Sequence, residues 1–314
     1  MNSNIKCLVL LSTYNGEHYI KEQIYSILQQ DDVDVKIIIR DDGSKDKTVD
    51  IIRAIEDNRI ELHAEENIGC IPSFSWLVNY ASTHYSDYEY FAFSDQDDYW
   101  IENKLAKGIE AIATLPSDQP NLYFCNMALV DGNLKFVNNM RNHDIDIRLG
   151  NTWLGGRAAG CTMVFNRKLV KMYARHNPSF CYHDYWAYLI AMYFGQIVYD
   201  PIPYIKYRQH EFNVLGAHGL VSKKAKNEQR LHYWFSSNKA GKRNRQCAAE
   251  FLTVYGKDLP QVKRKIILTY IRYHSSIVDF CNFVTSSQFD SDEPERKCFK
   301  GKILFFLRAL LGKY

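Results

Sequence analysis

The 314-residue sequence has no uninterrupted apolar run of about 18 residues, so no segment predicts a transmembrane helix. Its eight cysteines show neither C-x-x-C nor metal-finger spacing, which indicates reduced, mostly buried thiols and a cytosolic protein. No signal peptide is expected, because the first apolar run, Cys7 to Leu11, is too short for one. These absences argue against a membrane-spanning protein and against a disulfide-stapled domain.

The composition provides for a substantial core, with 46% hydrophobic and 24% charged residues. The length allows one large domain and a smaller piece. The net charge of +3 hides an asymmetry: residues 215–314 hold 19 Lys and Arg against 8 Asp and Glu, a balance of +11, which leaves −8 for residues 1–214. A polybasic end on an acidic body indicates an anionic surface as the partner of that end.

Apolar runs and helical periodicities alternate along residues 1–214, which predicts an α/β domain with a mostly parallel sheet. Beyond about Val214 only helical patterns remain, so residues 215–314 are expected to form a basic helical region. Between 133 and 157 the periodicity fades, as is typical of a loop beside a site. The expected strands are 5–11, 35–40, 59–63, 88–93, 121–130, 158–165, 197–198 and 202–207. Expected helices begin near 17, 72 and 182. Others are expected at 45–56, 101–115, 222–238, 243–257, 260–285 and 299–312.

Polar residues follow three of these strands: Ser12 to Gly16, Asp41 to Ser44, and Asp95 to Asp98. The carboxyl ends of parallel strands share one edge of a sheet, where α/β proteins bind ligands. Three carboxylates within Asp95-Gln96-Asp97-Asp98 repel one another unless a cation lies among them, and oxygen ligands suit Mg²⁺ or Mn²⁺. The alternative is a solvated acidic turn that caps the next helix.

Two further segments carry candidate chemistry. His183-Asp184 enters an apolar helix, where Asp184 is either a functional acid or simply a favourable first-turn charge. His210 follows the last predicted strand, and a lone histidine there is more often a satisfied polar residue than a ligand.

Taken together, the motifs over about residues 5–214 resemble the inverting family-2 glycosyltransferases of the GT-A fold. Tyr207-Arg208-Gln209-His210 through Asn213 is most similar to bacterial polysaccharide rhamnosyltransferases. The resemblance implies a Rossmann-like GT-A domain at 1–214 with a helical C-terminal extension, and a metal-dependent enzyme that uses a nucleotide-sugar.

The resemblance also implies roles for individual residues. The ring of Tyr14 would stack on the base and Asp41 would accept a pyrimidine N–H. Asp184 would be the base that takes the acceptor proton. The donor site would comprise Ser12, Tyr14, Asn15, Asp41, Asp42 and Asp95. The divalent metal would be held by Asp97, with Asp98 or Asp95 as alternative or additional ligands and His210 as the distal one. His183 stands where the family usually has an acidic residue, so its role is open.

The expected donor is dTDP-rhamnose, with a UDP-hexose or UDP-HexNAc as the alternative. The expected acceptor is a saccharide or a lipid-linked saccharide, at the inner face of the cell membrane. Residues 298–314 mix apolar and basic side chains like an interfacial helix. The alternative is a helix packed on the body or a dimer contact.

Two other classes fit less well. A nucleotidyltransferase would favour a glycine-rich basic loop after the first strand, but Ser12 to Gly16 has one glycine and no basic residue. A nucleic-acid-binding module would use the basic tail, but the body of −8 would repel a phosphate backbone. No nucleic-acid partner is therefore expected.

Overall fold

The computed structural model describes residues 5–142, 158–209 and 242–272, together with the single positions 145, 147, 153 and 278. The chain divides into two compact units. The first comprises residues 1–144, 158–178 and 182–216, and the second comprises 145–157, 179–181 and 217–314. The predicted boundary near residue 214 remains a prediction, and each unit is described by itself.

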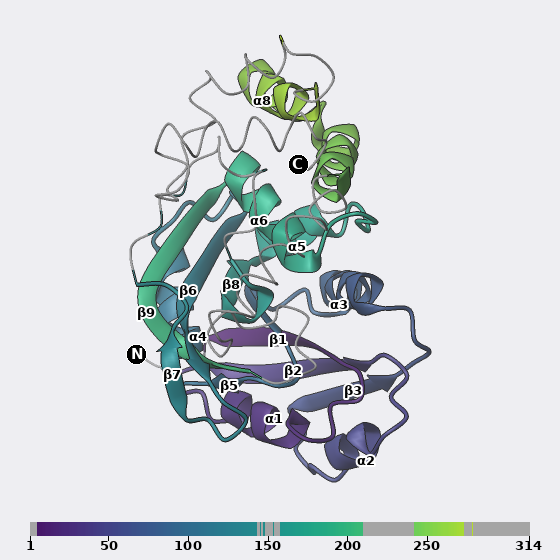
Figure 1. Cartoon of the computed structure of the whole chain (residues 1–314), viewed down its shortest axis with the longest axis vertical. Helices are drawn as coiled ribbons and strands as arrows, with labels where there is room; N and C mark the ends of the chain where they lie inside the picture. The colour runs from purple at the N-terminus through teal and green to yellow at the C-terminus, as the bar shows by residue number, and fades with distance from the viewer. Residues whose placement is uncertain are drawn as a thin grey trace, which may run out of the picture. The chain divides into compact units, whose positions relative to one another are not determined.

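The first unit is built on one nine-stranded sheet, with the main path β3-β2-β1-β4-β8-β6-β9-β5 and β7 paired to β6 (Figure 1). The strands are β1 (Lys6–Thr13), β2 (Asp34–Asp41), β3 (Ile60–Ala64), β4 (Tyr90–Ser94), β5 (Tyr99–Trp100), β6 (Asn121–Val130), β7 (Phe136–Asn139), β8 (Met163–Asn166) and β9 (Gln196–Arg208). Strands β3, β2, β1 and β4 pair in parallel, as do β6 and β9, whereas β8 is antiparallel to both β4 and β6. The predicted α/β fold with a mostly parallel sheet is confirmed.

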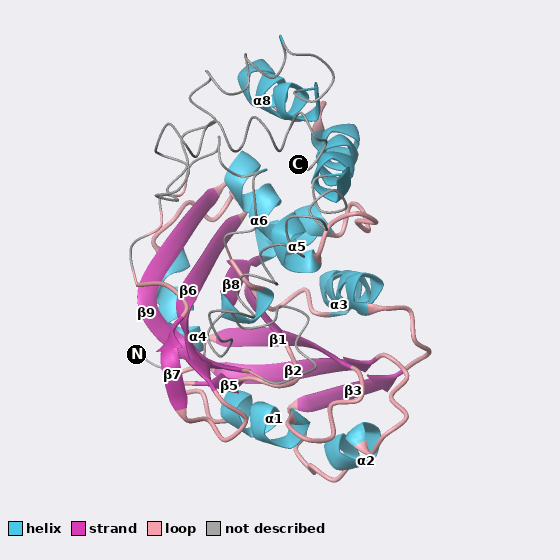
Figure 2. Ribbon diagram, in the orientation of Figure 1, coloured by secondary structure: helices cyan, strands magenta, loops and turns pink. Residues whose placement is uncertain are grey.

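Helices cover both faces of this sheet, which explains why its central strands are continuous apolar runs. Alternate residues of β1, such as Val9 and Leu11, join a core with the inward side chains of α1, α2 and α4. Figure 2 shows α1 and α2 on one side of β1–β3 and α3 on the other. The helices are α1 (Ile20–Leu28), α2 (Thr48–Arg53), α3 (Cys70–His84), α4 (Lys104–Ala113), α5 (Arg167–Tyr173) and α6 (His183–Phe194).

The second half of the sheet departs from the prediction. Residues 196–208 form the single strand β9 rather than two short strands, because shifts of register against β6 near Asn126 accommodate the prolines at 201 and 203. The predicted strand at 158–165 is instead a 3₁₀ turn, Gly160–Thr162, followed by β8. Strand β7 lies inside the segment expected to be a loop. The short elements β5 and α5 had no distinct sequence signal.

In the second unit, residues 242–255 are helical and α8 spans Gln261–Arg272. Trp153 is buried and packs against Phe251 and Tyr270, with ring centroids 5.9 and 5.7 Å away. The Glu250 carboxylate accepts the backbone N–H of Ser179 at 2.9 Å. The predicted helices at 222–238 and 299–312 lie outside the described residues. Among the residues that are described, no helix is long and apolar enough to cross a membrane.

Candidate active site

The parallel register brings the polar tips of three strands together. Thr13 at the end of β1 pairs with Asp41 at the end of β2, and Leu11 pairs with Ser94 at the end of β4. The segments that begin at Tyr14, Asp42 and Asp95 therefore leave the same edge of the sheet. This is the arrangement expected from the strand pattern.

Tyr14 follows β1 and Asp41 ends β2 at this edge of the sheet. The Tyr14 side chain is exposed, with 46% of its surface accessible, whereas Asp41 is buried and accepts the backbone N–H of Ser44 at 2.9 Å. Asn15 adopts a positive φ of 49°. Its N–H donates to Ser44 Oγ at 2.8 Å, and its side-chain Oδ1 accepts the N–H of Lys45 at 2.8 Å. Asn15 thus joins the loop after β1 to the loop after β2.

Asp42 and Ser12 are engaged with helix α3 and the loop that leads into it. Asp42 is buried, pairs with the guanidinium of Arg40 and accepts the N–H groups of Ile68 and Gly69 at 2.9 and 2.8 Å. Ser12 shares a hydroxyl hydrogen bond of 2.7 Å with Ser73. Both carboxylate oxygens of Asp42 therefore have protein partners, and the donor-site role expected for it stays a prediction.

Gln96, to which the sequence assigned no role, links the acidic turn to the end of β1. Its Oε1 accepts the Thr13 hydroxyl at 2.6 Å and the Tyr14 N–H at 2.8 Å, and its Nε2 donates to the Tyr14 carbonyl at 3.2 Å. A Cβ on Gly16 would lie 2.4 Å from Gln96 Oε1, so only glycine allows this approach. The amide therefore sets the position of Tyr14 relative to the carboxylates.

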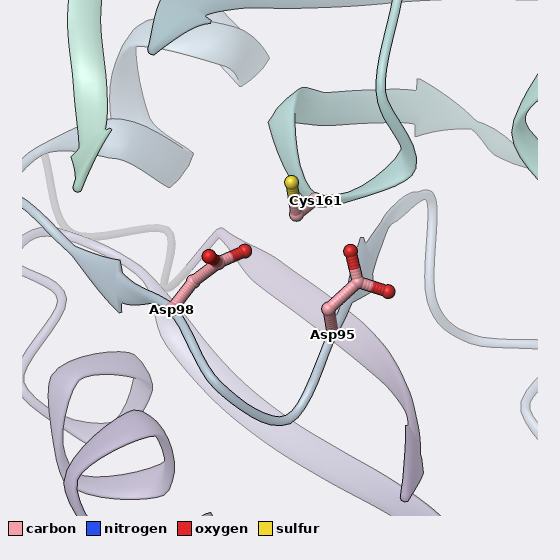
Figure 3. A group of neighbouring side chains, drawn as sticks. All are labelled: Asp95, Asp98 and Cys161. Carbon is pink, nitrogen blue, oxygen red and sulfur yellow. The ribbon is translucent and has the colours of Figure 1, made fainter. Parts of the chain in front are cut away.

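Asp95 and Asp98 converge with the thiol of Cys161 (Figure 3). One ligand atom from each lies within 4.8 Å of the others. Asp98 is fully buried; its Oδ1 accepts the Arg208 N–H at 3.3 Å, and its Oδ2 has no hydrogen-bond partner among the described residues. An unpaired buried carboxylate oxygen beside a second carboxylate fits a divalent cation. Cys161 was expected only to be a buried thiol, because nothing in its spacing marks it.

The pKa values of Asp95 and Asp98 are both raised. Burial, and then the charges of Asp97 and Asp184, raise the pKa of Asp95 from 3.8 to about 7. Burial, and then Asp97 and Asp95, raise the pKa of Asp98 well above its ordinary value. A bound cation would oppose both effects, since it favours the ionised carboxylates. Asp97 is half-buried, and the predicted distal ligand His210 lies outside the described residues.

Asp184 lies in the first turn of α6 and faces this group closely enough for its charge to act on Asp95. Its Oδ2 accepts the N–H of Gly160 at 3.2 Å, and its Oδ1 accepts the N–H of Tyr185 at 2.6 Å. The structure therefore unites Asp184 with the acidic turn, although 85 or more positions separate them in the chain.

Arg208, at the end of β9, also contacts the acidic turn. The side chain is buried; its Nε donates to the Asp97 carbonyl at 2.9 Å, and a terminal nitrogen donates to the Gly132 carbonyl at 2.6 Å. It also pairs with Glu22 of α1 at 2.5 Å. The sequence drew attention to this arginine only as part of a motif, without a contact.

Comparisons with known proteins identify the family. The sequence model of "Glycosyl transferase family 2" matches residues 8–173. Over 236 residues, 69% of this chain and 76% of the relative, the chain is 30% identical to the dTDP-rhamnosyl transferase RfbG of Shigella flexneri. It is also 30% identical to the Escherichia coli "UDP-Glc:alpha-D-GlcNAc-diphosphoundecaprenol beta-1,3-glucosyltransferase WfgD", over 42% of this chain and 46% of the relative.

Two solved structures share the fold. Residues 1–349 of the S. aureus protein TarS, in complex with UDP-GlcNAc, superpose with a TM-score of 0.57 at 18% identity, covering 97% of this chain and 81% of that fragment. The mannosyltransferase PcManGT of Pyrobaculum calidifontis, in complex with GDP-Man and Mn²⁺, has a TM-score of 0.53 at 17% identity, covering 98% of this chain and 80% of PcManGT. The GT-A fold expected from the sequence is thereby confirmed.

Proposed function

The chain belongs to glycosyl transferase family 2, whose members are enzymes that use nucleotide-sugars, and from that premise we propose that it transfers L-rhamnose from dTDP-rhamnose with inversion. The acceptor is a saccharide carried on a lipid diphosphate, and the product enters a cell-surface polysaccharide. The similarity to RfbG supports the rhamnosyl donor, and the diphosphoundecaprenol in the name of WfgD supports the acceptor class.

The observation that carries this proposal is a set of contacts at one edge of the sheet. Gly160 donates its N–H to Asp184, and its neighbour Cys161 converges with Asp95 and Asp98 of the acidic turn. Gln96 of the same turn accepts the backbone N–H of Tyr14. We assign Tyr14 to stacking on the base and Asp41 to its pyrimidine N–H. Ser12, Asn15, Asp42 and Asp95 belong to the surrounding donor site. The hydrogen bonds of Asn15 and Asp42 support a role for both residues in shaping the donor site.

The acidic turn is the proposed metal site, for Mn²⁺ or Mg²⁺. Asp97, Asp98 and His210 are the proposed ligands, with Asp95 as an alternative or additional one. The convergence of Asp95 and Asp98 with Cys161 supports Asp95 and adds Cys161 as a candidate. When bound, the ion neutralises the charge that develops on the diphosphate leaving group. The buried, unpartnered Asp98 Oδ2 supports this assignment.

Asp184 performs the proton transfer in this mechanism. Sugar transfer passes through an oxocarbenium-like state, and inversion requires a base on the face opposite the leaving group. Asp184 takes the proton of the acceptor hydroxyl as the hydroxyl oxygen attacks the anomeric carbon. The bond from that carbon to the diphosphate oxygen breaks, and the nucleoside diphosphate leaves. The Gly160 N–H donates to Asp184 Oδ2 at 3.2 Å and orients the carboxylate.

A donor screen tests the proposal. The full-length protein is incubated with Mn²⁺, a lipid-linked saccharide and dTDP-rhamnose, UDP-glucose, UDP-galactose or UDP-GlcNAc. The expected result is preference for dTDP-rhamnose and a product of inverted anomeric configuration. Preference for a UDP-sugar would replace the donor assignment, and a product that retains the configuration of the donor would contradict the mechanism.

Substitution of Asp97 tests the metal assignment. Asp97→Asn should abolish Mn²⁺-dependent transfer while the melting temperature stays the same or rises, because repulsion among the acids is relieved. Arg53→Met on the exposed end of α2 serves as the neutral control. Full activity of the unchanged protein in EDTA would rule the metal out.

A further inference from the structure

His183, the residue before the proposed base, is packed as an aromatic ring among other rings. Its imidazole stacks on Phe74 of α3, with centroids 3.5 Å apart and planes 15° from parallel. It also meets Phe93 of β4 edge-on, at 4.8 Å and 82°. Only 6% of the residue is accessible. His183 therefore joins the start of α6 to the strand that leads directly into Asp95.

The Nε2 edge of the imidazole lies against Gly160. A Cβ placed on Gly160 would lie 2.4 Å from His183 Nε2, so the ring occupies the space that any other residue at 160 would need. The N–H of this same Gly160 donates to Asp184 Oδ2 at 3.2 Å. A displacement of the ring would therefore release the backbone group that orients the base.

The imidazole makes no polar contact in the described part of the chain. Neither Nδ1 nor Nε2 has a hydrogen-bond partner there. Burial lowers the pKa of His183 to about 3, so the ring is neutral at physiological pH. A neutral ring without hydrogen bonds is not arranged to carry a proton for Asp184.

We propose that His183 is a positioning residue that acts through its aromatic surface: stacked on Phe74, it presses against Gly160 and so holds the Gly160 N–H on Asp184. This inference rests on the proposed role of Asp184 as the base. It gives a physical role to a histidine that stands where the family usually has an acid.

Three substitutions separate the aromatic surface from the nitrogens. His183→Phe keeps a flat ring, His183→Gln keeps polar atoms but no ring, and His183→Ala keeps neither. The control is His63→Phe, at another histidine packed among rings: His63 contacts Trp76 and Tyr80 on α3 and lies on β3, at the end of the sheet path. Unlike His183, its Nε2 also bonds Glu61 at 2.9 Å. For each variant the turnover number, the affinity for dTDP-rhamnose and the melting temperature are measured.

The expected result is that His183→Phe keeps turnover within about threefold of the unchanged protein, since the swap nearly conserves volume. His183→Ala and His183→Gln should lose about 10²-fold in turnover, because the base is misplaced. Donor affinity should stay unchanged in all three. If His183→Gln outperforms His183→Phe, the nitrogens matter and the proposal is overturned. The proposal is also overturned if His183→Ala has a normal turnover number, or if both the donor affinity and the turnover number of His183→Ala fall.

Hydrogen exchange provides a reading that does not depend on activity. The amide of Gly160 should exchange faster in His183→Ala and remain protected in His183→Phe. Equal protection of this amide in His183→Ala and the unchanged protein would overturn the positioning role. An unchanged protein that transfers no sugar would instead defeat the proposed function, while the exchange result would still decide the packing role of His183.

Discussion

At the scale of single residues, the site combines carboxylates whose environments differ. Asp98 is fully buried, whereas Asp95 and Asp184 are half-buried. Burial, and then the charges of Asp97 and Asp184, raise the pKa of Asp95. Such a group is costly when it is ionised and metal-free. The cost is relieved when a cation binds, so the acidic turn couples stability to ligand occupancy.

Asp184→Asn keeps the shape and the hydrogen bond from Gly160 but cannot take a proton. Transfer should fall by roughly 10²-fold or more, with the affinity for the nucleotide-sugar unchanged. Turnover by product assay and donor affinity by calorimetry check this. A joint loss of donor binding and turnover would assign Asp184 to the donor site or to the fold.

The raised pKa of Asp95 predicts that the stability of the metal-free protein depends on pH. The folded protein keeps the Asp95 proton up to about pH 7, whereas the ordinary pKa is 3.8. Because the folded state binds more protons between these values, the free energy of unfolding contributed by Asp95 falls as pH rises through that window and is constant above it. In EDTA, the melting temperature of the unchanged protein should therefore decline relative to that of Asp95→Asn from about pH 4 to about pH 7.

Addition of Mn²⁺ should make the melting temperatures of the unchanged protein and Asp95→Asn change with pH in the same way, because the ion favours the ionised carboxylates. Thermal denaturation scans across the pH window, with and without Mn²⁺, make the comparison. Parallel melting curves for both proteins in EDTA would show that Asp95 ionises normally in the fold.

At the scale of elements, strand β9 holds the acidic turn through its last side chain. Arg208 reaches the Asp97 carbonyl, the Gly132 carbonyl and Glu22 of α1, and its guanidinium lies 4.4 Å from the centre of the Tyr19 ring. One buried side chain thus joins β9, α1 and two loops. The end of β9 is consequently part of the site's support as well as part of the sheet.

Arg208→Met should destabilise the protein by roughly 2–4 kcal/mol, because buried carbonyl groups lose charged donors. The control Arg53→Met, at an exposed position of α2, should change the free energy of unfolding by less than about 0.5 kcal/mol. Urea denaturation of both variants measures the two values. A loss for Arg208→Met as small as that of the control would mean that the three contacts are not important for stability.

At the scale of the whole molecule, the charge is divided between a body of −8 and a C-terminal region of +11. A lipid-linked acceptor resides at an anionic membrane, and each basic side chain near such a surface contributes about 1 kcal/mol of attraction. The tail at 298–314 lies outside the described residues, and its sequence mixes apolar and basic side chains, a composition typical of interfacial helices. We therefore propose peripheral attachment at the inner face of the cell membrane.

Deletion of residues 298–314 should weaken flotation with anionic vesicles while dTDP-rhamnose binding is retained, and the binding of the full-length chain should decrease with salt. A full-length variant with glutamine at the tail positions of Lys300, Lys302, Arg308 and Lys313 separates charge from length, and neutral vesicles are the lipid control. Equal flotation of the deleted and full-length proteins would assign the tail to packing or dimer formation instead.

The sequence by itself determined the family, the α/β fold and the acidic strand tips, because these depend on local patterns. An apolar run followed by Asp95-Gln96-Asp97-Asp98 identifies a buried strand and its tip without any knowledge of neighbours. The same reasoning misjudged β9, because the shifts of register against β6 that admit its prolines are a property of a pair of strands.

Only the tertiary structure decided which side chains complete the site. Gln96 contacts Thr13 across 83 positions, and Arg208 contacts Asp97 across 111. Cys161 meets Asp95 and Asp98, and His183 meets Phe74, solely because the sheet order sets β8 and α6 against β4 and α3. Local periodicity specifies which face of an element is buried, but the partner across that face depends on the order in which strands pair, and no short stretch of sequence contains that order.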